Sequence, residues 1–473
     1  MLARTVIKNF IYNSSSIFIA NITGLILVIF LARFLKPELF GIYSLSLATI
    51  SIFSIFADLG INSAATRYIA DAVTKNDRDL AGSYSRFLIN FKLTLSAFVS
   101  ILVFLLSETI STVFEKPLSE VLKILSLFIF FSSTSSLFNS MANAMNDFRL
   151  NFLSYTVSGI LKLSITFLLV FLGLSLLGAV LALVFSSLIT LIFAIHYVFK
   201  RYRFLFQGKK NFSRANVLRF IGFTTILSVT WILFANVDMV MIGYFLSSED
   251  VAFYRAGFSI VSAIIGLISI PAVLFPIFVR LEGEDLKKAF KRTFKYSSAL
   301  CIPSAFGLAI ISENLLLFAY GIEYFPGIEA MRILSLLLIS PVFGIYGSIF
   351  SSKEKPELNF YPLIFSMLLN VLLNYILIPT HGINGAAVAT VLSNVVFWVL
   401  LGVTCTRKFG IRPEISHIVK PTISATPMLF FGLIIGSAIL VIIVSILVYS
   451  AILFLIRGIT KEDVEFIRAI AKI

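Results

Sequence analysis

Eight charged residues lie within long apolar stretches of this chain, where a charge is costly and usually marks a function. They are Arg33, Asp58, Lys92, Lys123, Lys162, Asp238, Arg255 and Arg332. Lys162 lies roughly ten residues inside its stretch and the two aspartates roughly eight, so all three are deep at about 1.5 Å per residue. A deep lysine can pair with an aspartate, and an aspartate can instead carry a coupling cation.

Four of the eight charges lie near the ends of their stretches: Arg33, Lys92, Lys123 and Arg332. Long basic side chains at such positions can bury their aliphatic part and extend the charged group to the lipid headgroups. We therefore predict that these four reach the membrane surface.

Other reactive residues give no pattern of catalysis or metal binding. Cys301 and Cys405 both lie in apolar runs without a Cys-x-x-Cys spacing, and the three histidines are scattered. The sequence contains no nucleophile–base pair and no glycine-rich phosphate loop. We therefore expect no catalytic residues, no metal and no cofactor.

The composition is that of an integral membrane protein. Hydrophobic residues make up 59% of the 473 positions and charged residues 13%, whereas soluble domains have about 45–50% and about 25%. This excludes a disordered chain, a disulfide scaffold and an ordinary cytosolic enzyme. We predict an all-α protein with about 14 transmembrane helices, since each crossing needs about 20 apolar residues. The predicted spans are 10–35, 41–65, 85–107, 119–144, 152–172, 175–199, 217–246, 251–280, 292–312, 328–350, 358–378, 384–406, 418–436 and 438–457.

The distribution of positive charge predicts the orientation of these helices. Most of the 38 lysines and arginines fall in the loops that face the cytoplasm if the N-terminus is inside. The outer loops hold only two bases, Lys36 and Lys116, and carry nine acids instead. This positive-inside bias places both termini in the cytoplasm. It also accounts for the net charge of +14 without a nucleic-acid partner.

The two halves of the chain carry an internal repeat. Residues 34–51 align with 245–262, and residues 177–186 align with 384–393, at nearly equal offsets. One six-helix block used twice gives parallel repeats, because an even number of spans preserves orientation. Such folds place the substrate between the lobes and work by rocking, which predicts a transporter.

The repeat sets the expected domain boundaries. The final two helices form an appended pair, although residues 422–455 carry no charge and one long tilted helix is the alternative. The predicted ranges are 1–200 for the N-terminal lobe, 201–219 for a basic cytoplasmic linker, 220–407 for the C-terminal lobe, and 408–473 for helices 13 and 14 with the cytoplasmic tail.

Four motifs resemble those of the polysaccharide-biosynthesis and O-antigen flippases, and together they run from the first helix to the tail. One is the turn Leu35–Tyr43 (LKPELFGIY), and another is Asp58-Leu-Gly60 with Arg67. A third combines the Asn-x-x-x-Asn of 370–374 with residues 378–390 (IPTHGINGAAVAT), and the fourth is 458–465 (GITKEDVE). The likeness places the chain in the multidrug/oligosaccharidyl-lipid/polysaccharide exporter superfamily.

The resemblance implies both a fold and an activity. The superfamily fold is two six-helix bundles around a central V-shaped cavity. The family moves lipid-linked oligosaccharides, built on a polyprenyl phosphate or pyrophosphate, from the cytoplasmic to the outer leaflet. The expected location is the plasma membrane, and the expected partners are the glycan-lipid, membrane lipids and enzymes of glycan synthesis.

An anionic substrate head needs cations along its path across a slab about 30 Å thick. Lys162 and Arg255, from opposite lobes, are the first candidates for binding its phosphates. Arg4, Lys8 and Arg67 are candidates for holding the head at the inner mouth. The alternative for Lys162 is a structural ion pair with an aspartate.

Polar residues on the predicted helices are candidates for the cavity wall or for ion coupling. These are Asp58, Asp238, Asn21, Asn143, Asn370 and Asn374. Asp58 is also a candidate structural partner or helix cap, and Asp238 could pair with Arg255. For the asparagines, hydrogen bonding between helices is the alternative.

Two other classes share some of these features. A multidrug or cation-coupled exporter of the same superfamily would need an acidic ion site, which Asp58 or Asp238 could supply. A membrane enzyme such as a glycan polymerase would usually need a large outer loop with catalytic groups. The longest outer loop, 312–327, is short, so we expect no enzyme.

Overall fold

A computed structural model describes residues 2–268, 278, 281–353, 355–434, 438–460 and 463. Within these residues the chain is helical and contains no β-strand. Nine of the described helices are long and apolar enough to cross a membrane. Two compact units make up the chain, Met1–Arg255 and Ala256–Ile473.

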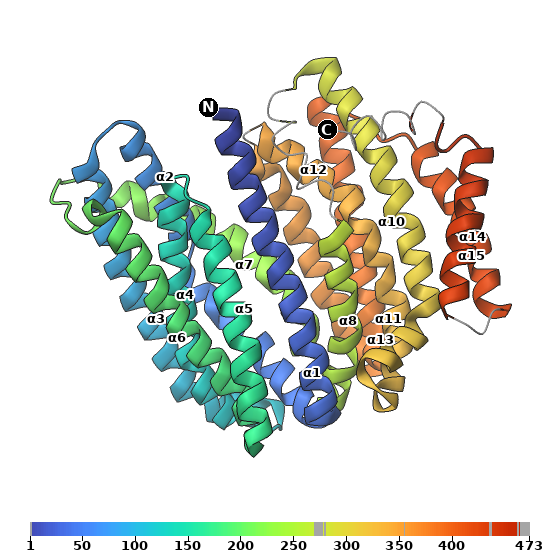
Figure 1. The fold of residues 1–473 in the computed structure, drawn as a ribbon, viewed down its shortest axis with the longest axis horizontal. Coiled ribbons are helices and arrows are strands. Elements are labelled where there is room, and N and C mark those ends of the chain that lie inside the picture. The colour runs from blue at the N-terminus through green and yellow to red at the C-terminus, as the bar shows by residue number, and fades with distance from the viewer. Residues whose placement is uncertain are drawn as a thin grey trace. The chain divides into compact units, whose positions relative to one another are not determined.

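The described part of the first unit contains seven α-helices and the start of an eighth. They are α1 (Leu2–Asp58), α2 (Ile61–Thr74), α3 (Arg78–Phe114), α4 (Ser119–Ala144), α5 (Arg149–Leu169), α6 (Ser175–Arg201), α7 (Arg214–Phe245) and the start of α8 (Ser248–Ile268). Within this unit α4 packs against α3 and α6, while α5 packs against α6 and α1 (Figure 1). Small side chains at these contacts, such as Gly159 and Gly178, allow the close helix approach typical of membrane bundles.

Three of the longest helical stretches are broken where the sequence predicts a turn between two spans. In α1 the break is at Lys36 (φ 61°), directly before Pro37, which has no backbone N–H to donate. Between α5 and α6 a five-residue π-turn, Val170–Leu174, contains Gly173 at φ 89°. In α13 (Phe360–Phe409) the break is at Gly382 (φ 59°), a conformation that glycine adopts without steric cost.

The second unit contains the end of α8 and the later helices. These are α10 (Gly283–Tyr320), α11 (Ile328–Leu334), α12 (Ser340–Ser352), α13, α14 (Ser416–Ile434) and α15 (Ala438–Leu455). Its core includes the aromatic cluster of Phe290, Phe294 and Tyr346. The last two helices pack against each other and against α10 (Figure 1). Because two parts of one straight helix cannot pack side by side, this contact favours two helices over one long helix in residues 422–455.

Candidate functional site

Lys162, the deepest predicted cation, lines a polar pocket inside the first unit. The pocket has a volume of about 180 Å³ and lies between α4, α5 and α6. Its lining residues are Phe128, Ser132, Ser135, Ser136, Asn139, Ser154, Tyr155, Ser158, Lys162, Ser187 and Thr190. Lys162 lies 13 residues after Arg149, the first residue of α5, or about 20 Å along the helix axis.

Two hydroxyl groups of this pocket donate their protons within their own helices. Ser132 donates to the Phe128 carbonyl at 2.6 Å, and Thr190 donates to the Ser186 carbonyl at 2.7 Å. Because these protons are used within the helices, the hydroxyl lone pairs remain to accept bonds from a ligand. The ammonium of Lys162 adds a charged donor. This combination can bind a group with both hydroxyls and negative charge.

Two features of the sequence build the pocket. The serines of α4 are small and leave space between the helices. On the other side, α1 approaches α5 closely at Gly159, where an added Cβ would lie 2.9 Å from Thr23 Oγ1. The glycine therefore fixes α1 beside the helix that carries Lys162, one turn before it.

The expected aspartate partners of Lys162 have other contacts. No described carboxylate forms an ion pair with Lys162. Asp58 instead pairs with Lys92, whose side chain is fully buried. The prediction that Lys92 reaches the headgroups is therefore wrong, because depth along a helix does not specify the face of a side chain, and that of Lys92 is buried against Asp58. Lys123 and Arg332 form exposed ion pairs with Glu108 and with Glu313 and Glu329.

Asp58 ends α1 in a tightly held turn. Leu59 and Gly60 both have positive φ, and a Cβ on Gly60 would lie 2.1 Å from Thr224 Oγ1. Thr225 donates a 2.7 Å hydrogen bond to the Leu59 carbonyl. The Asp-Leu-Gly motif thus joins α1, α3 and α7, which is the structural role that the sequence offered as an alternative for Asp58.

In the first unit, Arg255 and Asp238 each contact a residue that is adjacent to the other in the sequence. The hydroxyl of Tyr254 donates to Asp238 at 3.1 Å, and Arg255 Nη1 lies 3.7 Å from the sulfur of Met239. Arg255 is not among the residues that line the Lys162 pocket.

The asparagine candidates differ in their surroundings. Asn370 and Asn374 are fully buried, with Asn374 donating to Asn370 at 3.1 Å and Asn370 donating to Ser393 at 3.2 Å. This second bond joins the two halves of α13 across Gly382. Asn143 accepts from Asn151 at 2.9 Å, and Asn21 is half-buried on α1.

The candidates for the inner mouth are only partly described. Arg67 is exposed on α2, with its guanidinium carbon 4.5 Å from the Phe220 ring centroid. Arg4 and Lys8 belong to the backbone of α1, but their side chains lie outside the described residues.

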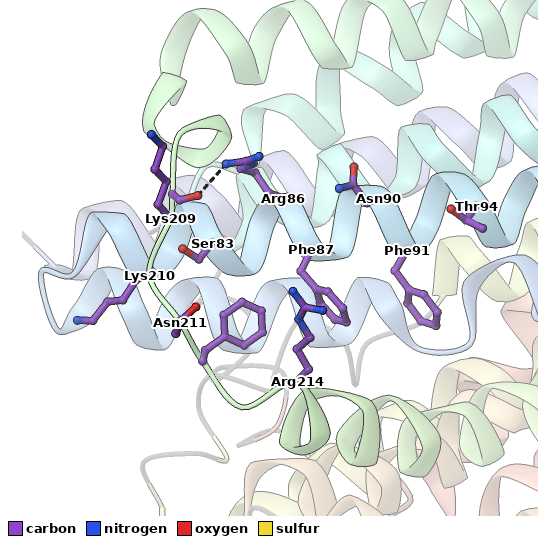
Figure 2. Close-up of a pocket in the computed structure, with 12 residues that line it drawn as sticks. Ser83, Arg86, Phe87, Asn90, Phe91, Thr94, Lys209, Lys210, Asn211 and Arg214 are labelled. Carbon is purple, nitrogen blue, oxygen red and sulfur yellow. Dashed lines mark hydrogen bonds between the residues drawn. The ribbon is translucent and has the colours of Figure 1, made fainter.

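Sequence reasoning missed two larger cavities. One, of about 510 Å³, lies beside α3 and is lined by four basic residues (Figure 2). The other, of about 520 Å³ in the second unit, is lined mainly by apolar residues of α10, α14 and α15. In the sequence the basic residues indicate only the topology, and the apolar residues indicate only membrane-spanning segments.

Comparison with known proteins assigns the chain to a family. The sequence signature described as "Polysaccharide biosynthesis protein" matches residues 6–282. The chain belongs to this family. The membership confirms the resemblance inferred from the motifs, and with the nine apolar helices it makes the chain a multi-pass membrane protein.

Relatives of this family member carry transport names. A probable low-salt glycan biosynthesis flippase of Haloferax volcanii, Agl15, is 27% identical over 441 residues, covering 88% of each chain. A putative O-antigen transporter of Shigella flexneri is 26% identical over 407 residues, covering 81% of this chain and 94% of the relative. The solved structure of the lipid II flippase MurJ, in an inward closed conformation, shares the fold. Its TM-score is 0.76 at 18% identity, over 92% of this chain and 97% of MurJ.

Proposed function

We propose that this family member is a flippase. It would move lipid-linked oligosaccharide or polysaccharide precursors from the cytoplasmic to the outer leaflet by alternating access, without a chemical step. The relatives named as a glycan biosynthesis flippase and an O-antigen transporter support this proposal. The observation that carries it is the pocket of hydroxyls around Lys162, at mid-depth in α5.

The chemistry of the described cavities suits the three parts of such a substrate. A phosphate head must cross hydrocarbon about 30 Å thick, and a fixed ammonium at mid-depth lowers that barrier. The hydroxyl-rich wall around Lys162 can exchange hydrogen bonds with sugar hydroxyls. The apolar cavity of α10, α14 and α15 suits a polyprenyl chain.

The proposal includes an arrangement in the membrane. Counting each break at Lys36, Gly173 and Gly382 as a turn between spans divides the nine described long apolar helices into twelve crossings, and α14 and α15 bring the number to fourteen. These would form two six-helix lobes related by a parallel repeat, plus a C-terminal pair, with the ranges given by the duplication. We place the protein in the plasma membrane with both termini in the cytoplasm, on the positive-inside bias. Membrane lipids and glycan-synthesis enzymes are the proposed partners.

Transport by reconstituted protein tests the role of Lys162. Vesicles containing the Lys162→Ala variant should flip a fluorescent lipid-linked oligosaccharide at least about tenfold more slowly than the parent protein, because one phosphate contact is lost. Lys162→Arg should retain most of the rate. Lys123→Ala is the matched control, since it removes an equal charge from an exposed ion pair.

Two results would contradict the proposal. If Lys162→Ala flips the lipid-linked oligosaccharide at the parental rate, the pocket is not part of the transport path. Transport of cationic dyes, with no transport of the lipid-linked glycan by the parent protein, would instead indicate a multidrug exporter of the same superfamily. Monodispersity of each variant in size-exclusion chromatography verifies that the altered protein is folded.

A further inference from the structure

The cavity beside α3, called here the α3 basic pocket, is formed by the first half of α3 and the segment 208–214. It has a volume of about 510 Å³, within the range of small-molecule sites. Four of its lining residues are basic and none is acidic. The lining residues are Ser83, Arg86, Phe87, Asn90, Phe91, Thr94, Gly208, Lys209, Lys210, Asn211, Phe212 and Arg214.

Contacts within the protein hold the wall of this pocket in place. Gly208 packs so closely on α3 that an added Cβ would lie 2.0 Å from the Ser83 backbone nitrogen. Arg86 Nη1 donates to the Gly208 carbonyl at 3.0 Å, as Figure 2 shows. The Lys209 backbone N–H donates to Asp79 at 3.0 Å. A site built in advance in this way loses little ordering entropy when a ligand binds.

Much of the positive charge in the pocket is not neutralised by the protein. Lys210 pairs with Asp77, outside the pocket lining. No described carboxylate forms an ion pair with Lys209 or Arg214, and Arg214 lies over the Phe87 ring at 5.7 Å. Arg86 uses one of its five N–H donors on Gly208, which leaves the others for a ligand. The free donors fit a phosphate group, which guanidinium and ammonium groups bind with charge-assisted hydrogen bonds.

The pocket changes character along α3. Arg86, Asn90 and Thr94 follow one another at four-residue spacing on one face, with the rings of Phe87 and Phe91 beside them (Figure 2). The two rings are nearly parallel, with centroids 6.0 Å apart. Farther along α3, Phe98 is 61% exposed, as expected for a helix surface that faces lipid. The basic end therefore lies at the segment 208–214, and the aromatic end leads toward the hydrocarbon.

We propose that the α3 basic pocket binds the phosphate headgroup of an anionic lipid. The phosphate would contact Arg86, Lys209 and Arg214, and the first part of the aliphatic chain would lie along Phe87 and Phe91. Two lipids share this chemistry, a bulk anionic phospholipid and a polyprenyl phosphate. Binding at this pocket does not depend on the proposed transport function.

The test measures binding to the intact purified protein in neutral detergent by native mass spectrometry. The probes are phosphatidylglycerol, polyprenyl phosphate, the neutral lipid phosphatidylcholine and inorganic phosphate. The double variant Lys209→Gln/Arg214→Gln should bind both anionic lipids at least about tenfold more weakly than the parent. The matched control, Lys200→Gln/Arg219→Gln, removes two exposed charges near the same segment but outside the pocket and should change binding less than about twofold.

Each result decides between stated alternatives. Equal loss for both anionic lipids supports a general anionic-lipid site, and selective loss for polyprenyl phosphate supports a site for the carrier lipid. Binding of inorganic phosphate as tight as that of the lipids would overturn the lipid assignment. Equal effects of the pocket and control variants would overturn the site itself.

A second variant guards against a folding defect. Phe91→Ala leaves every cation in place and should weaken lipid binding without changing the binding of inorganic phosphate. If Phe91→Ala leaves lipid binding at the parental level, the aliphatic chain does not lie along α3 and the proposal fails.

Discussion

The buried ion pair between Lys92 and Asp58 allows a quantitative test of the fold. The Lys92 side chain is fully buried, whereas the Asp58 side chain is 29% exposed. Removing one partner of a buried pair usually costs about 3–5 kcal/mol, because the other charge remains desolvated. Since Asp58 keeps some access to its surroundings, we expect Asp58→Ala to cost about 3 kcal/mol, at the low end of this range.

A double-mutant cycle separates the pair from its individual residues. Lys92→Met combined with Asp58→Ala removes both charges, so the double variant should lie within about 1 kcal/mol of the parent protein. At about 2–4 °C per kcal/mol, Asp58→Ala should lower the unfolding temperature by about 6–12 °C. Thermal unfolding in one detergent, followed by tryptophan fluorescence, measures these differences. The exposed pair of Lys123 and Glu108 is the control, and breaking it should cost less than about 1 kcal/mol.

The reasoning would be refuted by either of two results. If Asp58→Ala is no less stable than the control variant, the buried lysine does not need this carboxylate. If the double variant loses the sum of the single losses, the two side chains do not interact. Loss of transport with full stability in Asp58→Asn would instead identify Asp58 as an ion-coupling group.

Three further predictions concern the loops. Gly208→Ala should detach the segment 208–214 from α3 and make it more sensitive to limited proteolysis, whereas Gly222→Ala, where the added Cβ meets no atom within 4 Å, should not. Hydrogen bonds from the Lys210 side chain and from the backbone N–H of Leu80 lower the pKa of Asp77. The stabilisation from this contact is therefore present above the pKa that Asp77 has in the unfolded chain. It is lost as the pH falls through the pKa that Asp77 has in the folded protein. The protection of the backbone amides in the segment 208–214, taken relative to their intrinsic exchange rates at each pH, should therefore fall at low pH, and Asp77→Asn should remove the difference. An impermeant maleimide should label Glu323→Cys in intact cells but Lys210→Cys only after permeabilisation; the opposite pattern would reverse the topology.

The sequence determined the membrane helices and the family. Span length, apolar content and the bias of basic loops can be taken directly from contiguous segments of sequence. Each depends on the free energy of transferring that segment between water and the membrane. For the same reason the breaks at Lys36, directly before Pro37, and at Gly382 fall in predicted turns, since proline and glycine act on the local backbone. The family motifs are likewise contiguous segments of sequence.

The partners of the deep charges needed the tertiary structure. Depth along the sequence predicted that Lys162 and Asp58 lie far from the ends of their spans and that Lys92 reaches the headgroups. The pairing of Lys92 with Asp58 joins residues 34 positions apart, and depth along a helix does not specify which face a side chain occupies.

The α3 basic pocket could be identified only from the tertiary structure. Three of its four cations, Lys209, Lys210 and Arg214, lie in the segment that the sequence predicts as a basic linker, whereas Arg86 belongs to α3. Their gathering around one cavity depends on the close contact of Gly208 with α3 at Ser83, 125 residues earlier in the chain. Local sequence sets transfer free energies and turns, whereas binding sites arise from packing between distant segments, which only the folded chain decides.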